Sequence, residues 1–170
     1  MLINKNWYAV HTQESMEKKV AAQLFRRKVE TYLPLNKIVR KGWDGSSSVI
    51  ESVLFPSMVF ILAAPHEIEV IKQTDGVIGF IHWRSNLAII SHENIRSIKE
   101  FAHEHSYMWI EKCNVIPGHN VTATVQAGTD KRIYKVNNRP IDRIFLCSLG
   151  YNLIGFVREH SAAPLQHAIK

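Results

Sequence analysis

The fold of this chain depends on one apolar stretch, Val53-Leu54-Phe55-Pro56-Ser57-Met58-Val59-Phe60-Ile61. Its β-branched and aromatic residues are typical of a strand that is buried for most of its length. Proline cannot donate a hydrogen bond to a neighbouring strand, so Pro56 marks a strand start, a bulge or an edge. We therefore expect the chain to turn from a loose hairpin arm into a core strand at this point. Phe55 is either one more core aromatic or, beside such a break, a partly accessible side chain.

Composition allows a globular protein of one domain or two small ones, since the chain has 170 residues of which 46% are apolar. The net charge of +6 suits a protein that works near polyanions, although many proteins reach it without binding any. Cys113 and Cys147 form no CxxC pair and favour buried free thiols over a zinc site. Neither a signal peptide nor an apolar run of about 20 residues is visible. We therefore expect a cytoplasmic protein that does not bind membranes.

The first third of the chain reads as a strand, a helix and a long hairpin. Trp7–His11 is strand-like, and Thr12 is a candidate N-cap for a helix over Gln13–Lys28. The cations off the apolar stripe of this helix either form a solvated surface or face phosphates. Two strand-like arms, residues 31–40 and 49–62, flank a glycine- and serine-rich tip. Trp43 sits at this tip, where it either folds back or meets a partner.

The next segments complete a first domain. Pro65 can begin a short helix, Asp75-Gly76 is a turn signal, and Ser91 is a good N-cap for a last helix. Two further strands, 77–83 and 87–90, precede that helix. Hairpin-linked strands mixed with helices predict an α+β fold, in which helices pack on an antiparallel-rich sheet over residues 1–104.

The second half of the chain predicts a separate β-domain. The pattern fades at 105–113, which we interpret as a linker. Four short strand-like runs follow, separated by turn signals and without a helix, as is typical of a small β-barrel over residues 114–160. The runs are Val121–Gln126, Arg132–Val136, Ile144–Ser148 and Leu153–Arg158. Residues 161–170 form a tail without a clear pattern.

Four motifs, in this order and at this spacing, resemble the N-terminal (NGN) domain of the NusG family of transcription factors. They are Trp7–Thr12 before a basic helix, Leu54–Phe60, Thr74–Ile81, and Ile90-Ser91 at the start of a helix. The resemblance covers roughly the first 105 residues. Length and divergence resemble the specialised paralogues of this family, such as RfaH and the UpxY-type antiterminators of polysaccharide loci.

The second half resembles the SH3-like KOW barrel of the same family more loosely. Pro117-Gly118 and Val121–Gly128 match the motif around its first strand, whereas Thr129–Ile133 replaces a glycine-bearing loop. The resemblance implies a KOW-like barrel. Because of this departure, it does not settle whether the barrel binds a ribosomal protein or a termination factor, as typical barrels of the family do.

The resemblance implies a site for the clamp helices of RNA polymerase. In this sequence the apolar depression that receives them is lined by Tyr8, Phe55, Pro56, Met58 and Ile90. An aromatic anchor in an apolar pocket supplies much of the energy of a modest interface.

Beside that site, the resemblance implies contact with the non-template DNA strand, and nascent RNA is a further candidate partner. Cations interleaved with aromatic rings suit a single strand. The candidates are His11, Lys19, Arg26, Arg27, His82, Trp83 and Arg84. A core position for Trp83 and a solvated turn position for Arg84 are equally consistent with the sequence.

We find no catalytic motif, since P-loop, GxSxG, HExxH and paired-carboxylate patterns are missing from the sequence. His103 and His105 lie on different sides of a helix, so we expect no metal site and no cofactor. The sequence therefore predicts a non-enzymatic transcription elongation or antitermination factor that acts on particular operons, such as polysaccharide loci. The alternative is an RNA- or ribosome-binding module with a KOW-like barrel.

Overall fold

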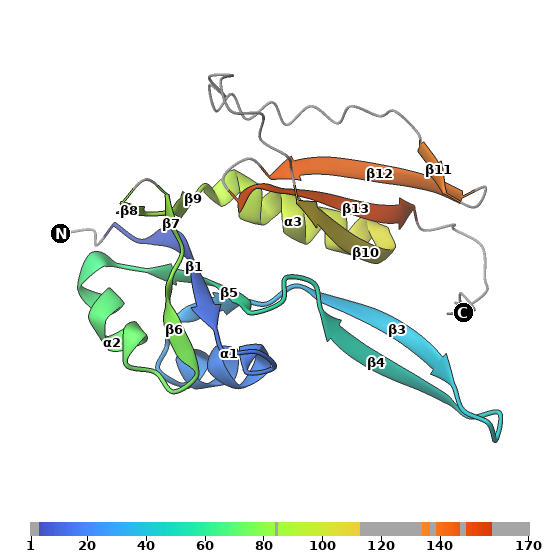
Figure 1. The fold of residues 1–170 in the computed structure, drawn as a ribbon, viewed down its shortest axis with the longest axis horizontal. Helices are drawn as coiled ribbons and strands as arrows, with labels where there is room; N and C mark the ends of the chain where they lie inside the picture. Colours follow the sequence, from blue (N-terminus) through green and yellow to red (C-terminus); the bar gives the residue numbers. More distant parts are fainter. Residues whose placement is uncertain (1–3, 84, 113–133, 137–138, 147–148, 158–170) are drawn as a thin grey trace.

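The structure is a computed structural model that describes residues 4–83, 85–112, 134–136, 139–146 and 149–157 (Figure 1). Its N-terminal half is built on an antiparallel sheet with the strand order β2-β5-β1-β6. The central strand β1 (Asn6–Thr12) pairs with β5 (Met58–Ala63) on one side and with β6 (Val77–Phe80) on the other. Strand β2 (Glu30–Tyr32) extends the sheet beyond β5, and β9 (Ile89–Ile90) also pairs with β1. The predicted core strand after Pro56 is thus confirmed as β5.

The helices confirm the α+β prediction, with one correction at the start of α1. The helical elements are α1 (Glu17–Arg26), η1 (Pro65–Glu67), α2 (Ile68–Lys72) and α3 (His92–Glu104). Ser91 caps α3 as predicted, because its Oγ accepts a hydrogen bond from the Asn94 N–H at 3.1 Å. Thr12 does not cap α1: it stays in β1, where its N–H donates to the Ser57 carbonyl at 2.9 Å. Thr12 therefore belongs to the sheet and not, as the local pattern predicted, to the start of the helix.

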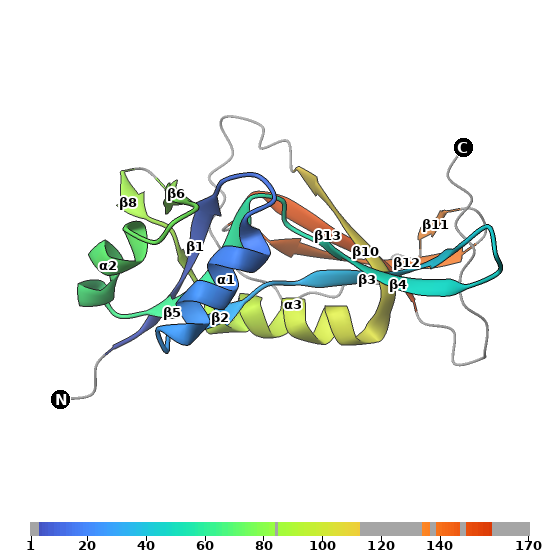
Figure 2. The same ribbon diagram turned by 90° about the horizontal axis from the view of Figure 1, so that it is seen from below.

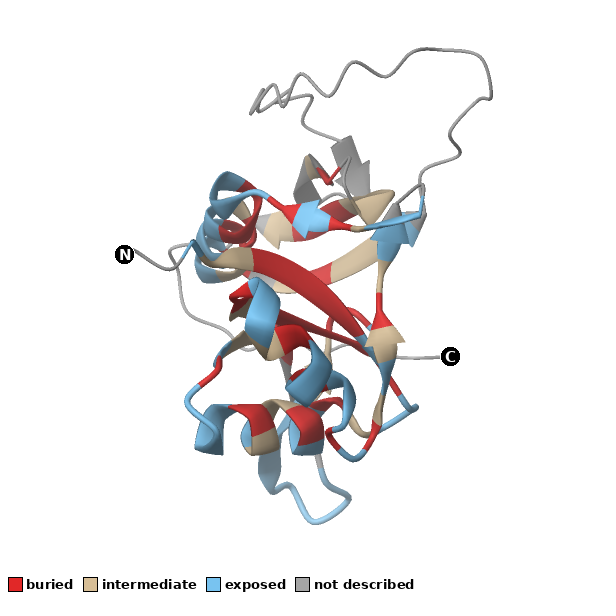
Figure 3. Ribbon diagram, turned by 90° about the vertical axis from the view of Figure 1, so that its left-hand side faces the viewer, coloured by how far each residue is buried: buried red, intermediate tan, exposed pale blue. Residues whose placement is uncertain are grey.

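The two faces of the N-terminal sheet contact different partners because side chains alternate along its strands. Tyr8 and Val10 of β1 face α1 and α2, in a core that also holds Val20 and Leu24. Trp7 and Ala9 face the opposite way, toward α3. Figure 3 shows the resulting buried layers on both sides of the central strands. We call the side of Trp7 the α3 face.

A long hairpin leaves the N-terminal sheet between β2 and β5. It consists of β3 (Leu35–Lys41) and β4 (Ser47–Val53), paired from Leu35↔Val53 to Lys41↔Ser47. Figure 1 shows the hairpin extending away from the N-terminal sheet to its tip at the lower right, and in the view from below it runs across the C-terminal strands (Figure 2). The prediction of a long hairpin is therefore confirmed. A second, two-residue pairing joins β7 (His82–Trp83) to β8 (Asn86–Leu87).

The C-terminal strands form a second antiparallel sheet with the order β10-β13-β12-β11. Its strands are β10 (His105–Lys112), β11 (Tyr134–Val136), β12 (Arg139–Leu146) and β13 (Tyr151–Val157). The prediction of a linker over 105–113 is wrong for residues 105–112, which form β10 and pair with β13. Pairing with a strand some 45 positions away supplies order that a local pattern does not reveal. The predicted strand Val121–Gln126 lies outside the described residues, so the closed barrel stays a prediction.

Candidate functional site

Three of the apolar residues that the sequence singled out, Phe55, Pro56 and Met58, lie at a tight turn between β4 and β5. Ser57 adopts the left-handed conformation there, with φ of 55°, and the Met58 N–H donates to the Phe55 carbonyl at 3.3 Å. Glu17 of α1 holds the turn, because its Oε1 accepts the Ser57 N–H at 2.7 Å. The break that Pro56 predicted is this turn. Pro56 itself lies exposed on its outer side.

Three of the five predicted polymerase-binding residues pack together on the α3 face. Phe55, Met58 and Ile90 share one buried cluster with Trp7 and Phe60. The Phe55 ring meets the Phe60 ring edge-on, with centroids 5.3 Å apart. This cluster, with Pro56 at its edge, is what we call the Phe55 face.

Tyr8 does not belong to the Phe55 face. It points to the other side of the sheet, where its ring meets Phe80 edge-on at 5.8 Å. Trp7 takes its place on the Phe55 face, and sequence reasoning missed it. The signal that would have found it is the period of two along a strand, which puts adjacent residues on opposite faces. Trp7 and Ala9 of β1 accordingly lie in one buried cluster, and Tyr8 and Val10 lie in the other.

An aromatic and basic edge borders the Phe55 face. The Lys99 ammonium lies over the rings of Trp7 and Tyr32, at 5.4 Å and 5.1 Å from their centroids. The indole N–H of Trp7 donates to Nδ1 of His92 at 3.2 Å. Burial raises the pKa of Tyr32 to about 12. The edge thus joins an apolar face to an exposed cation on α3.

The C-terminal sheet covers the Phe55 face in this structure. The Tyr151 ring of β13 packs edge-on against Phe55 at 6.1 Å, and Leu146 and Leu153 join the same buried cluster. Only 1% of the Phe55 surface remains accessible. The expectation that Phe55 stays partly accessible is therefore wrong for this arrangement, because a segment almost 100 residues away seals it.

Asn36 ties the base of the hairpin to the same C-terminal sheet. Its Nδ2 donates to the Met108 carbonyl at 2.7 Å, and its Oδ1 accepts the Met108 N–H at 3.0 Å. Among the described strands, β10 lies at the edge of its sheet, and the side-chain amide of Asn36 bonds its backbone as a neighbouring strand would. Asn36 is buried, and a buried amide needs hydrogen-bond partners such as these. We call this pair of bonds the Asn36 clamp.

The predicted nucleic-acid residues lie mostly on the surface. Lys19 of α1 and Arg27, the C-cap of that helix, both reach the turn before β6: Lys19 Nζ contacts Asp75 at 2.9 Å, and Arg27 donates to Thr74 Oγ1 at 3.1 Å. The hydrogen bond from Lys19 holds the pKa of Asp75 below its usual value. Lys19 and Arg27 thus stabilise the α1 contact with this turn in addition to presenting charge.

The remaining nucleic-acid candidates lie on several elements. Arg26 is exposed on α1, and His11 and His82 are exposed on strands β1 and β7. The Trp83 side chain and all of Arg84 lie outside the described residues. Phe25, which sequence reasoning passed over, is 73% exposed beside Arg26.

A metal-binding group of three or more His, Cys, Asp or Glu side chains does not occur among the described residues. Within the same residues, no helix is long and apolar enough to cross a membrane. The prediction that His103 and His105 share one helix is wrong for His105, which begins β10. His105 is buried with its Nδ1 2.7 Å from the Phe101 carbonyl, whereas His103 is exposed at the end of α3.

Residues 5–99 match the sequence model of the family described as NusG, transcription termination factor nusG. The chain belongs to the NusG family. The match covers more than half of the chain and confirms the resemblance that the four motifs carry. Its end within α3 leaves β10 to β13 outside the matched segment. Membership in the specialised branch of the family stays a prediction.

Two NusG proteins are similar to this chain. The transcription termination/antitermination protein NusG of Thermus thermophilus is 30% identical over 110 aligned positions, and the alignment covers 55% of this chain and 60% of that protein. A solved structure concerned with domain interaction in Thermotoga maritima NusG aligns with 69% of each chain at 21% identity and a TM-score of 0.41. The aligned part thus spans less than two thirds of the Thermus protein.

Proposed function

We propose that this chain is a non-enzymatic transcription elongation and antitermination factor. It binds the clamp helices of RNA polymerase through the Phe55 face, on particular operons such as polysaccharide loci, and works in the cytoplasm. Binding favours the elongating state of the polymerase over the paused state, because a ligand shifts an equilibrium by its difference in affinity for the two states. Membership in the NusG family supports this proposal.

One observation carries the choice of the Phe55 face. The segment that matches the NusG family does not bury this face by itself: Leu146, Tyr151 and Leu153, all outside residues 5–99, complete its cover. An apolar face that needs a cover from beyond its own domain is suited to exchange that cover for a partner. Trp7 and Phe55 are the type of aromatic anchor on which such interfaces depend.

The cover implies that polymerase and the C-terminal sheet compete for one surface. The side chains of Tyr151, Leu146 and Leu153 occupy the position that apolar side chains of the clamp helices take when bound. Binding therefore requires the C-terminal sheet to leave the Phe55 face, and the free energy of the cover lowers the apparent affinity for polymerase.

A second part of the proposal concerns nucleic acid. The exposed cations Lys19 and Arg26 of α1 and Arg27 at its C-cap contact the non-template DNA strand or nascent RNA, with His11 and His82 as further contacts. Exposed Phe25 adds a ring among these charges, as a stacking surface for a base requires. Trp83 and Arg84 stay candidates from the sequence.

Retention of core RNA polymerase by the immobilised full chain tests the proposal with two variants, Phe55→Ala and Ile61→Ala. Both remove a fully buried side chain from the N-terminal core, but Ile61 lies on the opposite face of the sheet. Each truncation costs about 2–5 kcal/mol of stability, so both variants are compared at a temperature at which circular dichroism shows them folded. We expect Phe55→Ala to lose retention and Ile61→Ala to keep it.

Equal loss in both variants means that stability and not the Phe55 face decides retention, and refutes the assigned surface. Retention that falls steeply between 50 and 200 mM salt and ignores Phe55→Ala instead favours the RNA- or ribosome-binding alternative, because phosphate contacts release counterions.

A further inference from the structure

The tip of the β3–β4 hairpin is a built turn. The Gly45 N–H donates to the Gly42 carbonyl at 3.1 Å, and the Gly42 N–H donates to the Ser46 carbonyl at 2.8 Å. Gly45 adopts φ of +80°, a conformation that glycine reaches without strain. Asp44 Oδ1 accepts the Ser46 N–H at 3.0 Å and closes the turn from the side. The sequence Gly42–Ser46 thus fixes its own backbone.

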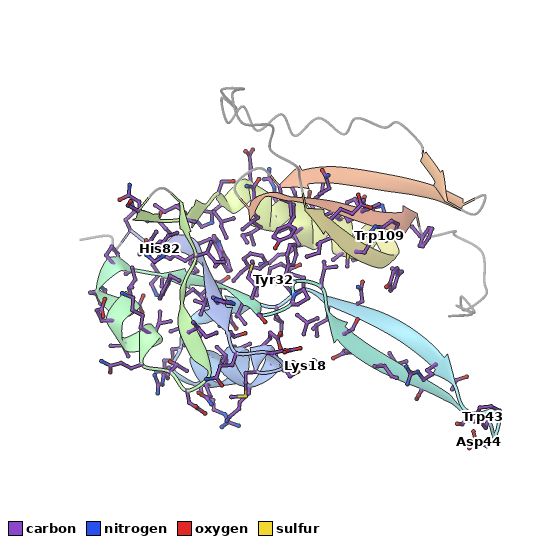
Figure 4. The ribbon with its side chains drawn as sticks, in the orientation of Figure 1. Lys18, Tyr32, Trp43, Asp44, His82 and Trp109 are labelled. Atoms are coloured by element: carbon purple, nitrogen blue, oxygen red, sulfur yellow. The ribbon has the colours of Figure 1, made fainter. Side chains whose placement is uncertain are left out.

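This turn holds Trp43 entirely in solvent, with a relative exposure of 106% (Figure 4). Of the two interpretations of the sequence, folding back onto the protein is therefore wrong. A tryptophan carries roughly 200 Å² of surface that folded proteins normally bury. The two seven-residue strands place it roughly 20 Å from the base of the hairpin. An ordered turn that presents a fully exposed indole at such a distance has the form of a contact element.

The charges of the hairpin identify the chemistry of its partner. Strand β3 carries three basic residues, Lys37, Arg40 and Lys41, and Arg40 is exposed. Of the two acidic residues, Asp44 is bonded within the turn. Glu51, near the base, pairs with Lys18 of α1 at 3.7 Å. The distal half of the hairpin therefore offers an indole, the cations Arg40 and Lys41 against the single carboxylate of Asp44, and the hydroxyls of consecutive serines. A ring with a net positive charge beside it is complementary to a base and its phosphate.

We infer that the hairpin tip is a binding element for single-stranded nucleic acid, in which Trp43 stacks on an unpaired base while Arg40 contacts the adjacent phosphate. A single strand is favoured over a duplex because the bases of a duplex are already stacked on one another. The inference goes beyond the proposed function, on which it rests only for the source of the strand. The surface is separate from the Phe55 face and from α1.

The test is a binding titration of the full chain against fluorescein-labelled 12-nucleotide oligo(dT), the corresponding oligo(U) and a 12-base-pair duplex. Three variants are compared with the wild type: Trp43→Ala, Trp43→Phe, and Ile78→Ala as a control. Ile78 is also an exposed large apolar residue, on β6 and away from the hairpin. Loss of one base–aromatic stack weakens binding by about 5-fold to 100-fold. We expect that loss for a single strand in Trp43→Ala, a smaller loss in Trp43→Phe, and none in Ile78→Ala.

Arg40→Ala should lower the slope of log affinity against log salt by about 0.7, the value for one phosphate contact on a single strand. Equal affinity of wild type and Trp43→Ala for both single strands overturns the inference, as does preference for the duplex. So does a blue shift of Trp43 emission, taken as the difference between wild type and Trp43→Phe, that occurs only with phosphatidylcholine–phosphatidylglycerol vesicles.

Polymerase retention by Trp43→Ala separates this inference from the proposed function. We expect Trp43→Ala to retain core RNA polymerase as the wild type does, since the tip is distant from the Phe55 face (Figure 1). Failure of the wild type to bind polymerase leaves the oligonucleotide result standing, and failure of the oligonucleotide result leaves the polymerase result standing.

Discussion

Replacement of Asn36 by alanine should release the C-terminal sheet from the base of the hairpin. The Asn36 clamp consists of two short hydrogen bonds from one buried amide to both backbone groups of Met108. Alanine removes both bonds and leaves the Met108 N–H and carbonyl without these partners at the edge of their sheet.

The magnitude follows from the two bonds. Each hydrogen bond contributes about 1 kcal/mol net, and a buried backbone group left without a partner costs about 1–3 kcal/mol. Because water can reach part of the freed strand edge, we expect a total of about 2–4 kcal/mol. For a chain of 170 residues, each kcal/mol corresponds to about 2–4 °C in Tm, so Asn36→Ala should lower Tm by about 4–16 °C.

The assay is thermal unfolding together with hydrogen exchange read at the Met108 amide. Asn86→Ala is the control, since it truncates the same type of side chain at an exposed position in β8. Asn36→Ala should lower Tm and speed exchange at Met108, whereas Asn86→Ala should do neither. A Tm within about 2 °C of the wild type, with unchanged Met108 exchange, refutes the clamp. A change in Tm that small is what an ordinary surface substitution produces.

Gly155→Ala should loosen the contact between β13 and α3. A Cβ at position 155 comes within 2.8 Å of ring atoms of both Phe101 and His105, which are stacked on each other. We expect the free energy of unfolding, measured in urea, to fall by about 1–3 kcal/mol. Glu67→Gln should make the chain less sensitive to acid. The Ala64 N–H, bonded to Glu67 Oε2 at 2.7 Å, holds the pKa of Glu67 below its unfolded value. The carboxylate therefore stabilises the fold above the unfolded pKa, and this contribution is lost as pH falls through the folded pKa. Urea unfolding at pH 7 and pH 3 should show a larger loss of stability for the wild type than for Glu67→Gln, and equal losses contradict this assignment.

Local patterns in the sequence predicted those elements whose cause is local. The proline and the apolar run of 53–61 located the turn before β5, and the N-cap Ser91 located the start of α3. The glycine- and serine-rich segment located the hairpin tip, where Gly45 takes the positive φ that the turn requires. In each case the residues that determine the structure are neighbours in the sequence, so periodicity and turn chemistry suffice.

Two of the three failures have a common physical cause, which is contact between distant segments. Strand β10 was assigned to a linker because its partner β13 begins at Tyr151. Thr12 was assigned to a helix cap although the sheet holds it through Ser57. Tyr8 was placed on the Phe55 face from a family resemblance, whereas alternation along β1 assigns that face to Trp7. Only the last of these errors could have been avoided from the sequence, by applying the period of two to the aromatic pair.

The cover of the Phe55 face links the stability of the clamp to the proposed function quantitatively. When a partner binds only the uncovered state, its apparent dissociation constant equals the intrinsic constant divided by the uncovered fraction. A variant that destabilises the cover should then strengthen polymerase binding by the same free energy, up to the point at which the uncovered state predominates. At about 1.4 kcal/mol for each factor of ten, the loss expected for Asn36→Ala corresponds to a gain of up to about 30-fold to 800-fold in affinity.

Phe55→Ala and Asn36→Ala therefore make opposite predictions for polymerase binding, although both lower stability. Phe55→Ala removes the anchor from the face that the partner contacts, whereas Asn36→Ala leaves that face intact and weakens only its cover. A general loss of folding would lower polymerase retention in both variants. A gain in polymerase affinity for Asn36→Ala therefore cannot be explained by lower stability alone. If Asn36→Ala lowers Tm as expected but leaves polymerase affinity unchanged, the C-terminal sheet does not compete with polymerase, and the binding surface must lie elsewhere on the N-terminal domain.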